Sequence, residues 1–208
     1  DFTIPSDGIT ALFGSSGSGK TSLLRCIAGL EENAIATIRF KNDLWQSHDY
    51  FLPTHERRIG LVFQRQNLFP HLSSRQNIEF AEKRVKSNFN NFNVDSVIDN
   101  LEIEHLLNKY PAQMSGGEQQ LVALARTLKS NPALLLMDEP LSSLDDPRKN
   151  RLLEIIKDLN TKQGLPILYV THSVDEVLKI ADHLLMIENG KLSVNKPLME
   201  AFDDETIN

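Results

Sequence analysis

Apolar residues along the chain follow two different spacings, and the two alternate. Runs that are continuous or that repeat at every second position predict buried strands. These runs occupy residues 9–13, 34–45, 57–64, 133–140, 166–172 and 183–192. Apolar residues spaced three and four apart predict amphipathic helices, at residues 21–30, 73–85, 94–107 and 147–160. Strands that alternate with helices in this way predict a parallel sheet covered on both faces.

The stretch from residue 67 to residue 129 differs from the rest because its pattern is helical and polar. An asparagine-rich break, SNFNNFN at residues 87–93, interrupts it. We therefore predict that residues 67–129 form an inserted helical lobe. Residues 1–66 and 130–208 then form the sheet-containing core of the same single domain.

Composition excludes several classes of function. The 208 residues are 40% hydrophobic and 24% charged, which is typical of a globular protein with a sizeable core. A net charge of −6 disfavours a nucleic-acid partner. No apolar run reaches the ~20 residues that span a bilayer, so the chain is not itself a membrane span. The single Cys26 excludes an internal disulfide.

The stretch FGSSGSGKTSLL, residues 13–24, lies between a predicted strand and a predicted helix. Gly14 is followed after four residues by Gly19, Lys20 and Thr21, which is the spacing of a phosphate-binding loop. Its bare backbone offers N–H groups to phosphate oxygens, Lys20 neutralises the outer phosphates, and the Thr21 hydroxyl binds Mg²⁺. A flexible glycine linker is the alternative, and the flanking strand and helix argue against it.

Two acidic residues follow the apolar strand LLLMDEP. Asp138 and Glu139 lie at the carboxyl end of that strand, where parallel sheets bind their ligands. An Asp in this position assists Mg²⁺, and a neighbouring carboxylate orients an attacking water. The alternative is a strand end with two solvated acids. Together with the glycine loop, the pair predicts hydrolysis of a nucleoside triphosphate.

A second candidate anion site begins the predicted helix in MSGGEQQLVALARTL, residues 114–128. Ser115, Gly116 and Gly117 lie where the N–H groups of a helix have no partner and its dipole is positive. Ser115 also has a structural explanation, because Glu118 three residues later completes a capping box. In isolation the two readings are equally good, and the nearby MDEP strand favours the anion site.

The motifs together resemble the nucleotide-binding subunit of ABC transporters. In the order of that family, the chain carries GSSGSGKT (Walker A), LVFQ (Q-loop), MSGGE (signature), LLLMDEP (Walker B), SSLD (D-loop) and VTHS (switch histidine). The resemblance implies an α/β fold of the P-loop NTPase class and ABC type. Such a fold has a mostly parallel sheet core, an antiparallel β subdomain and an inserted helical subdomain. It also implies an ATPase that uses ATP and Mg²⁺.

The same resemblance assigns roles to individual residues. It implies that Gln64 joins Thr21 and Asp138 at Mg²⁺, that Glu139 polarises water, and that His172 contacts the γ-phosphate. Two copies of the chain would enclose ATP head to tail as a homodimer, with Asp145 crossing between them. The residues expected to contact nucleotide are Gly14, Ser15, Ser16, Gly17, Ser18, Gly19, Lys20, Thr21, Ser22, Ser115, Gly116, Gly117, Glu118 and Asp145.

Within the family, the chain looks most like the ATPases of molybdate importers. The resemblance rests on GITALFGSSGSGKTSL, SGGE and LYVTHSVDEVLKIADHLLMIENGK. It implies a peripheral subunit on the cytoplasmic face of the membrane. Such a subunit contacts permease subunits through the segment from Gln64 to Phe80 and, through them, works with a substrate-binding protein. Import of iron, sulfate, polyamine or sugar remains an alternative, as does a non-transport ABC ATPase. A P-loop kinase or GTPase would leave MSGGE and VTHS without a role.

Three features depart from the family pattern or lie outside the chain. Leu121 occupies a position where the family usually has Arg. The aromatic residue that stacks on adenine is expected upstream of Asp1. The molybdate-type ATPases usually continue into an oxyanion-binding domain, so the chain is expected to be either trimmed or a short variant.

Overall fold

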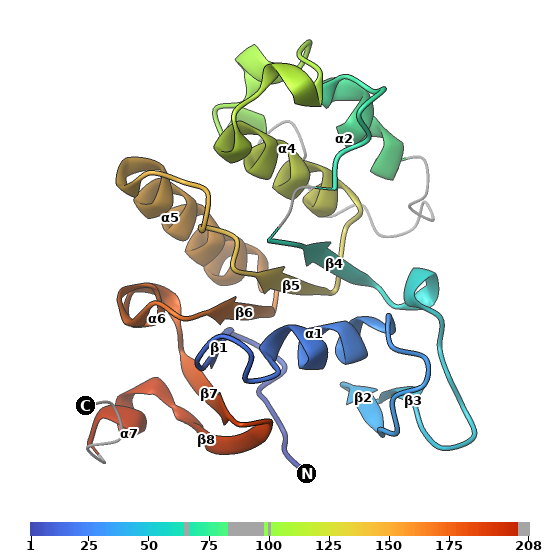
Figure 1. Cartoon of the computed structure of the whole chain (residues 1–208), viewed down its shortest axis with the longest axis vertical. Helices are drawn as coiled ribbons and strands as arrows, with labels where there is room; N and C mark the ends of the chain where they lie inside the picture. The colour runs from blue at the N-terminus through green and yellow to red at the C-terminus, as the bar shows by residue number, and fades with distance from the viewer. Residues whose placement is uncertain (65–66, 83–97, 100, 204–208) are drawn as a thin grey trace.

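The computed structural model describes residues 1–64, 67–82, 98–99 and 101–203. Within them, six strands form one sheet in the order β4-β5-β6-β1-β7-β8. All neighbouring strands are parallel except β7 and β8 (Figure 1). The strands are β1 (Ile9–Phe13), β4 (Ile59–Val62), β5 (Leu134–Asp138), β6 (Ile167–Thr171), β7 (His183–Glu188) and β8 (Lys191–Pro197). The predicted parallel core is confirmed.

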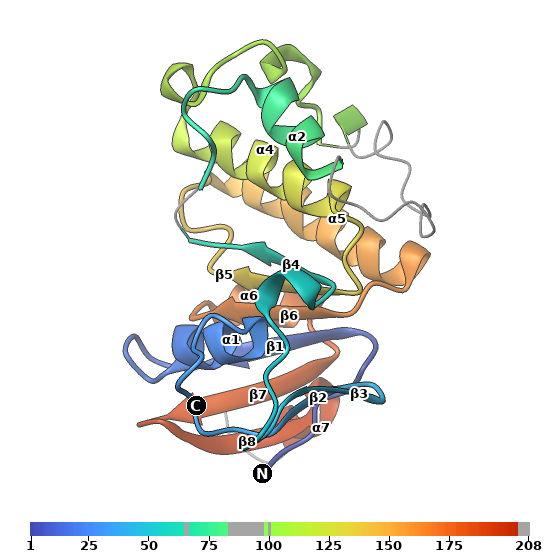
Figure 2. The same cartoon turned by 90° about the vertical axis from the view of Figure 1, so that its right-hand side faces the viewer.

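Both faces of the central strands are buried, which explains their continuous apolar sequences. In β5, Leu135 and Met137 belong to one core cluster, while Leu134 and Leu136 belong to another on the opposite face. Helix α5 (Asp146–Gln163) contributes Leu152, Ile156 and other buried residues to the first cluster. Helix α1 (Lys20–Ala28) covers the second face with Leu24 and Ala28. The two helices therefore lie on opposite sides of the sheet (Figure 2).

A helical region lies at one end of the molecule (Figure 2). It contains α2 (Ser74–Glu82) and α4 (Gly116–Lys129), which pack against each other, and the short 3-10 turns η2 (Glu104–Leu106) and η3 (Pro111–Gln113). The helix predicted at 73–85 is present as α2, although residues 83–85 lie outside the described part. The break at 87–93 and residues 94–97 and 100 of the predicted helix at 94–107 also lie outside it. The boundaries 67 and 129 stay a prediction.

Two segments predicted as single strands are hairpins instead. Residues 34–45 contain β2 (Ile38–Phe40) and β3 (Asp43–Gln46), which pair as an antiparallel two-stranded sheet. Lys41 allows the reversal by adopting a left-handed backbone, with φ 53°. Residues 183–192 contain all of β7, a turn at Asn189 and Gly190, and the start of β8. Both turn residues have positive φ, as Asn-Gly hairpins require.

The remaining described elements complete the outer layers. The turn η1 (Thr54–Glu56) connects the β2–β3 sheet to β4, α6 (Val174–Ile180) follows β6, and α7 (Leu198–Asp203) follows β8. Among the described residues, no helix has the length and apolar character needed to cross a bilayer.

Candidate functional site

The glycine loop connects β1 directly to α1, as its sequence predicts. Gly14 admits no side chain, since a Cβ there would lie 2.3 Å from the carbonyl oxygen of Ile187. Gly17 and Gly19 have φ of 80° and 105°, which side chains disfavour, and Gly19 is the N-cap of α1. The first turn of α1 therefore begins with N–H groups that face the loop without side chains in the way.

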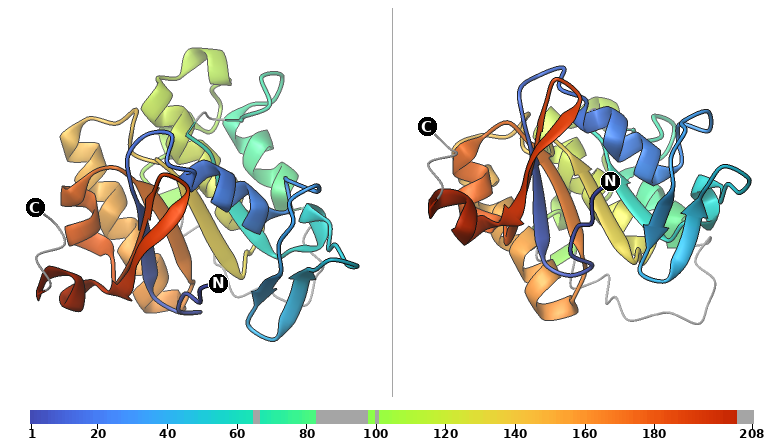
Figure 3. Two further views of the ribbon diagram at one scale, coloured as in Figure 1. Left: turned by 60° about the horizontal axis from the view of Figure 1, so that its bottom comes forward. Right: turned by 90° about the horizontal axis from the view of Figure 1, so that it is seen from below.

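The loop is held closed by its own lysine and by a neighbouring hairpin. The buried ammonium of Lys20 donates hydrogen bonds to the carbonyl oxygens of Gly14 and Ser15, each at 2.8 Å. The N–H of Gly190, in the β7–β8 turn, donates to the carbonyl oxygen of Ser18 at 3.1 Å. Figure 3 shows this hairpin beside the loop. The Ser18 Oγ is buried and has no hydrogen-bond partner among the described residues.

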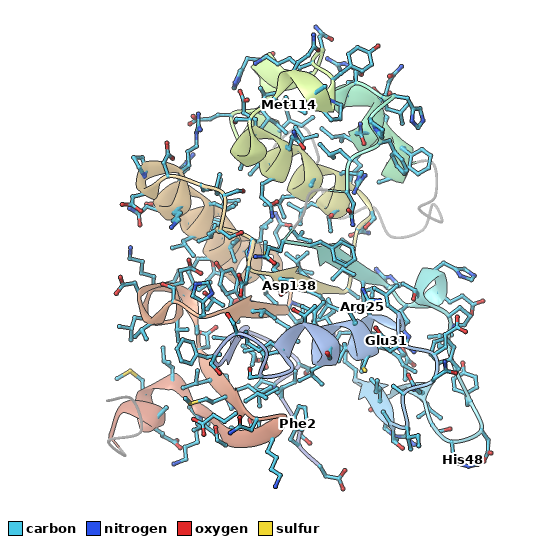
Figure 4. All side chains as sticks on the ribbon, in the orientation of Figure 1. Phe2, Arg25, Glu31, His48, Met114 and Asp138 are labelled. Carbon is cyan, nitrogen blue, oxygen red and sulfur yellow. The ribbon has the colours of Figure 1, made fainter. Side chains whose placement is uncertain are left out.

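Asp138 connects the end of β5 to the first turn of α1. The Thr21 hydroxyl donates to its carboxylate, at 3.0 Å to Oδ2 and 3.2 Å to Oδ1. Burial raises the pKa of Asp138; the Thr21 hydrogen bond lowers it, and the charge of Glu139 raises it further. Figure 4 shows Asp138 near the centre of the molecule, between the sheet and α1.

Glu139 is turned toward two other elements of the predicted site. Its Oε2 accepts a hydrogen bond from Gln64 Nε2 at 3.2 Å, and its Oε1 lies 3.2 Å from His172 Nδ1. The backbone of Glu139 is left-handed, with φ 45°, and its N–H donates to the carbonyl oxygen of Val170. A positive φ is uncommon outside glycine and frequent at functional sites. The structure thus brings together Gln64, Glu139 and His172 from three loops.

The start of α4 forms the capping box that its sequence allows. The Ser115 N–H donates to Glu118 Oε2 at 2.7 Å, and the Glu118 N–H donates to Ser115 Oγ at 3.3 Å. The hydrogen bonds from Ser115 lower the pKa of Glu118, with a further contribution from Lys109, whose Nζ lies 3.5 Å from Oε1. The capping box predicted for Ser115 is therefore present, and contact of Ser115 with an anion stays a prediction.

The signature residues pack on the loop between β5 and α5. A Cβ on Gly117 would lie 2.6 Å from Leu144 Cδ2, and one on Gly116 would lie 3.7 Å from Ser143 Cβ. Asp145 caps α5, because its Oδ1 accepts the Arg148 N–H at 3.2 Å. Leu121, which replaces the expected Arg, is half-buried and packs against the larger core cluster.

The predicted site residues thus fall into two separate groups within one chain. The glycine loop, Gln64, Asp138, Glu139 and His172 lie around the carboxyl end of the parallel strands. Met114, the first residue of the signature motif, lies in the helical region, well away from Asp138 in Figure 4. Ser115, Gly116, Gly117, Glu118 and Asp145 form the second group. They lie at the starts of α4 and α5, away from the glycine loop at the start of α1 (Figure 1).

The donor set of the first group fits a nucleotide phosphate with a hard divalent cation. Thr21, Asp138 and Gln64 offer oxygen ligands, and the buried Lys20 offers a positive charge. Among the described residues, no three His, Cys, Asp or Glu side chains cluster as a self-sufficient metal site. Mg²⁺ is commonly held in this way, by one or two protein oxygens together with substrate phosphates and water.

One group of interacting residues was not expected from the sequence. The carboxylate of Glu176 accepts hydrogen bonds from the hydroxyls of Tyr169 and Thr171, directly before His172. The spacing of Ser173 and Glu176, which matches a capping box, is the signal that could have directed attention there.

Comparison with known proteins decides the family. A model described as ABC transporter matches residues 1–142. The chain belongs to the ABC transporter family. The resemblance seen in the motifs is thereby confirmed, and the mostly parallel sheet with an antiparallel strand pair agrees with it.

The relatives of this ABC protein include importer ATPases. The Molybdenum import ATP-binding protein ModC of Thiobacillus denitrificans is 48% identical over 198 residues, which cover 95% of this chain and 55% of the relative. ModC of Saccharophagus degradans is 48% identical over 204 residues, covering 98% and 56%. The chain therefore spans about half the length of the curated relatives it matches. The predicted similarity to molybdate importer ATPases is confirmed.

Solved structures show the same cassette fold. The dimeric structure of the ATP-binding cassette MJ0796 in a post-hydrolysis state, bound to ADP and Pi, is similar with a TM-score of 0.81 and 28% identity. The match covers 95% of this ABC chain and 88% of that one. cbiO1 from Clostridium perfringens, part of the complex cbiONQ, gives a TM-score of 0.82 at 25% identity, covering 99% and 83%.

Proposed function

We propose that this chain is the ATP-hydrolysing motor of a binding-protein-dependent ABC importer for molybdate or a related oxyanion. The observation that carries the proposal is the convergence of Gln64 and His172 on Glu139, beside the hydrogen bond from Thr21 to Asp138. These residues lie at or just after the carboxyl ends of β4, β5 and β6 and in the first turn of α1, at the same edge of the sheet. The names of the relatives support the import function and the substrate.

Each residue of the first group has a role in binding or in hydrolysis. The loop from Gly14 to Ser22 holds the triphosphate with its N–H groups, and Lys20 exchanges its two carbonyl contacts for the β- and γ-phosphates. Thr21, Gln64 and Asp138 hold Mg²⁺, which neutralises phosphate charge as it does in other phosphoryl-transfer sites. The charged form of Asp138 is disfavoured in the isolated chain because it is buried beside Glu139. A bound cation would reverse that preference.

Glu139 is the group proposed to orient and polarise the attacking water. Its carboxylate is held from both sides, by the amide of Gln64 and by the imidazole of His172. Because both oxygens are already oriented, the carboxylate can present a lone pair to a water in a fixed direction. No further conformational entropy has to be lost to order the side chain during the reaction. His172, whose side chain is exposed, would also contact the γ-phosphate.

The second group completes the site only when two copies meet. The signature residues lie at the N-terminus of α4, and Asp145 lies on the adjoining loop at the start of α5. Both elements lie away from the phosphate loop of the same chain (Figure 1). A head-to-tail homodimer would bring the signature of one copy to the γ-phosphate held by the other. The dimeric state of the related cassette MJ0796 supports this arrangement.

A complementation experiment tests the hydrolysis and the two-copy site together. Lys20→Ala should abolish ATP binding, and Ser115→Asp should block hydrolysis by placing a carboxylate against phosphate, because like charges repel at close range. Asp is also a good N-cap, so α4 keeps its cap. Mixing the two inactive proteins should restore phosphate release, because a mixed dimer contains one intact site. Ser115→Asn, which caps without charge, is the matched control.

The outcomes separate the two parts of the proposal. No phosphate release by the unmodified chain, with or without its membrane partners, would remove the ATPase function. Normal turnover by Ser115→Asp would show that MSGGE serves only as a helix cap. If the unmodified chain hydrolyses ATP but the mixture of Lys20→Ala and Ser115→Asp never does, the result would argue against a site shared between two copies.

Import itself requires partners that we propose from the family. The segment from Gln64 to Phe80 would contact the permease subunits at the cytoplasmic face of the membrane, and a substrate-binding protein would act through them. Residues 65–66 of this segment lie outside the described part. Uptake of labelled molybdate, with sulfate as competitor, tests the substrate in cells whose importer ATPase is replaced by the full-length protein. Uptake of iron, polyamine or sugar in its place would favour the alternative importers, and no uptake of any would favour a non-transport ATPase.

A further inference from the structure

A single carboxylate ties strand β6 to the helix that follows His172. The Oε2 atom of Glu176, in the first turn of α6, accepts a hydrogen bond from Thr171 Oγ1 at 2.6 Å and another from the Tyr169 hydroxyl at 2.9 Å. Tyr169 and Thr171 are both buried and lie on the same face of β6. Burial and the charge of Glu176 raise the pKa of Tyr169, so its hydroxyl stays a donor.

The same network holds the backbone on both sides of His172. Thr171, before the histidine, is fixed through its hydroxyl to Glu176. Ser173, after it, donates its N–H to Thr171 Oγ1 at 3.0 Å and accepts the Glu176 N–H on its own Oγ at 3.4 Å. His172 itself is exposed and reaches Glu139 with Nδ1 at 3.2 Å. A shift of the 171–173 backbone would move the imidazole away from Glu139, so hydrogen bonds that fix this backbone help to keep the two side chains opposite each other.

Helix capping alone does not explain this arrangement. In a complete capping box the carboxylate at the third helical position accepts the N–H of the N-cap residue. Glu118 does so with Ser115, at 2.7 Å. At α6 the N-cap N–H, from Ser173, goes to Thr171 instead, and the Glu176 carboxylate is directed to the strand. Glu176 therefore has the spacing of a capping residue, but its carboxylate accepts hydrogen bonds from strand β6 and not from the N-cap N–H.

We propose that Glu176 is a positioning residue for hydrolysis: through the Tyr169 and Thr171 hydroxyls it holds the segment 171–173 so that His172 stays opposite Glu139. The inference rests on the proposed ATPase function. It adds a buried support behind the histidine, and it predicts that this support affects the rate of hydrolysis and leaves nucleotide binding unchanged. The glycine loop, which would bind the triphosphate, shares none of these hydrogen bonds.

The test compares two carboxylate-to-amide changes in the first turn of α6. Glu176→Gln keeps the size of the side chain and one oxygen that both hydroxyls can reach. It replaces a charged acceptor by a neutral one, and neutral acceptors form weaker hydrogen bonds. Asp175→Asn removes the same charge from an exposed neighbour in the same turn. We expect Glu176→Gln to lower the single-turnover rate of phosphate release about 10- to 100-fold, the size of effect that small misplacements cause. The ATP dissociation constant should change less than twofold, and Asp175→Asn should change neither quantity.

A double-mutant cycle with His172 distinguishes positioning from general destabilisation. If Glu176 acts through His172, Glu176→Gln should have little further effect on the rate in a His172→Ala background. Single-turnover conditions keep the slow background rate measurable. Equal rate losses in both backgrounds, or a rate unchanged by Glu176→Gln in the otherwise unmodified chain, would overturn the proposal.

Further variants keep the test informative if Glu176→Gln folds poorly. Tyr169→Phe keeps the buried ring and removes one donor, so it should lower the rate less than Glu176→Gln does. Thr171→Ser keeps the hydroxyl and should preserve the rate of phosphate release. Thr171→Val removes the hydroxyl and should lower that rate. Normal rates in both Tyr169→Phe and Thr171→Val would also overturn the proposal. Absence of hydrolysis by the unmodified protein would instead count against the proposed function.

Discussion

Replacing Glu139 by Gln separates the catalytic from the structural contribution of this residue. The change keeps the length and shape of the side chain and the left-handed backbone, at φ 45°. The carboxylate has two contacts, to Gln64 Nε2 and to His172 Nδ1, both at 3.2 Å. A glutamine can keep one with its oxygen, and rotation of the Gln64 amide can restore the other. The loss is at most one exposed hydrogen bond, or about 0.5–1.5 kcal/mol.

The expected effect on the rate is larger than this effect on stability. Loss of a general base lowers a rate by ~10²–10⁴, which corresponds to a barrier increase of about 3–5 kcal/mol. Glu139→Gln should therefore bind MgATP, release phosphate very slowly and accumulate as an ATP-bound dimer. Lys20, Thr21 and Asp138 keep their contacts, so affinity should change little.

Three measurements on the same samples check this expectation. Single-turnover phosphate release gives the rate, size-exclusion chromatography with MgATP gives the dimer, and urea unfolding gives the stability. Glu154→Gln, an exposed carboxylate on α5, is the control for removal of a charge. A rate within tenfold of the unmodified protein would refute the reasoning and leave the water-activating group unidentified. A loss of stability much above 1.5 kcal/mol would show that the contacts of Glu139 are more than one exposed hydrogen bond.

Three other substitutions test the structure around the site. Gly14→Ala should cost about 1–3 kcal/mol of stability and weaken ATP binding, because its Cβ would lie 2.3 Å from the Ile187 carbonyl oxygen, as urea unfolding and nucleotide titration can measure. In the unfolding series, Gly17→Ala shows what backbone strain costs without a clash, because its φ is 80° and its Cβ meets no atom within 4 Å. Hydrogen bonds from Ser115 hold the pKa of Glu118 below its usual range, so the ionised Glu118 stabilises the fold above about pH 4.3. This contribution is lost as the pH falls further, so Glu118→Gln should flatten the stability profile below that pH. An unchanged profile would contradict this role of Glu118. Both polar atoms of the buried Gln120 side chain lack a partner among the described residues, so Gln120→Leu should raise the stability by about 1–2 kcal/mol, and a loss would reveal a partner such as a bound water.

The local parts of the fold could be predicted from the sequence. β1, the glycine loop and α1 follow from neighbouring residues alone, because glycine freedom, apolar runs and helical spacing are local properties. The hairpins at 34–45 and 183–192 were predicted wrongly as single strands. The Asn189–Gly190 pair is a strong hairpin signal that was available. The turn at Lys41 carries no comparable signal, since lysine rarely adopts positive φ.

Contacts between distant residues could be expected only by resemblance. Gln64 and Glu139 are 75 positions apart, and Thr21 and Asp138 are 117 apart, so no periodicity connects them. What brings each pair together is the strand order, in which β5 lies beside β4, and the packing of α1 against the sheet. The spacing of Ser173 and Glu176 draws attention to this turn, but it predicts an ordinary helix cap and not the contacts of Glu176 with β6.

The different environments of the two adjacent carboxylates follow from one backbone feature. Asp138 is the last residue of β5, in register with Val170, and its side chain is buried against Thr21. At Glu139 the backbone turns to a left-handed conformation, and the next carboxylate reaches Gln64 and His172 instead. Burial raises the pKa of Asp138, and the charge of Glu139 raises it further. A cation held by Asp138 would favour the ionised form of that carboxylate, so the backbone turn at Glu139 divides the pair into one group for the cation and one for the attacking water.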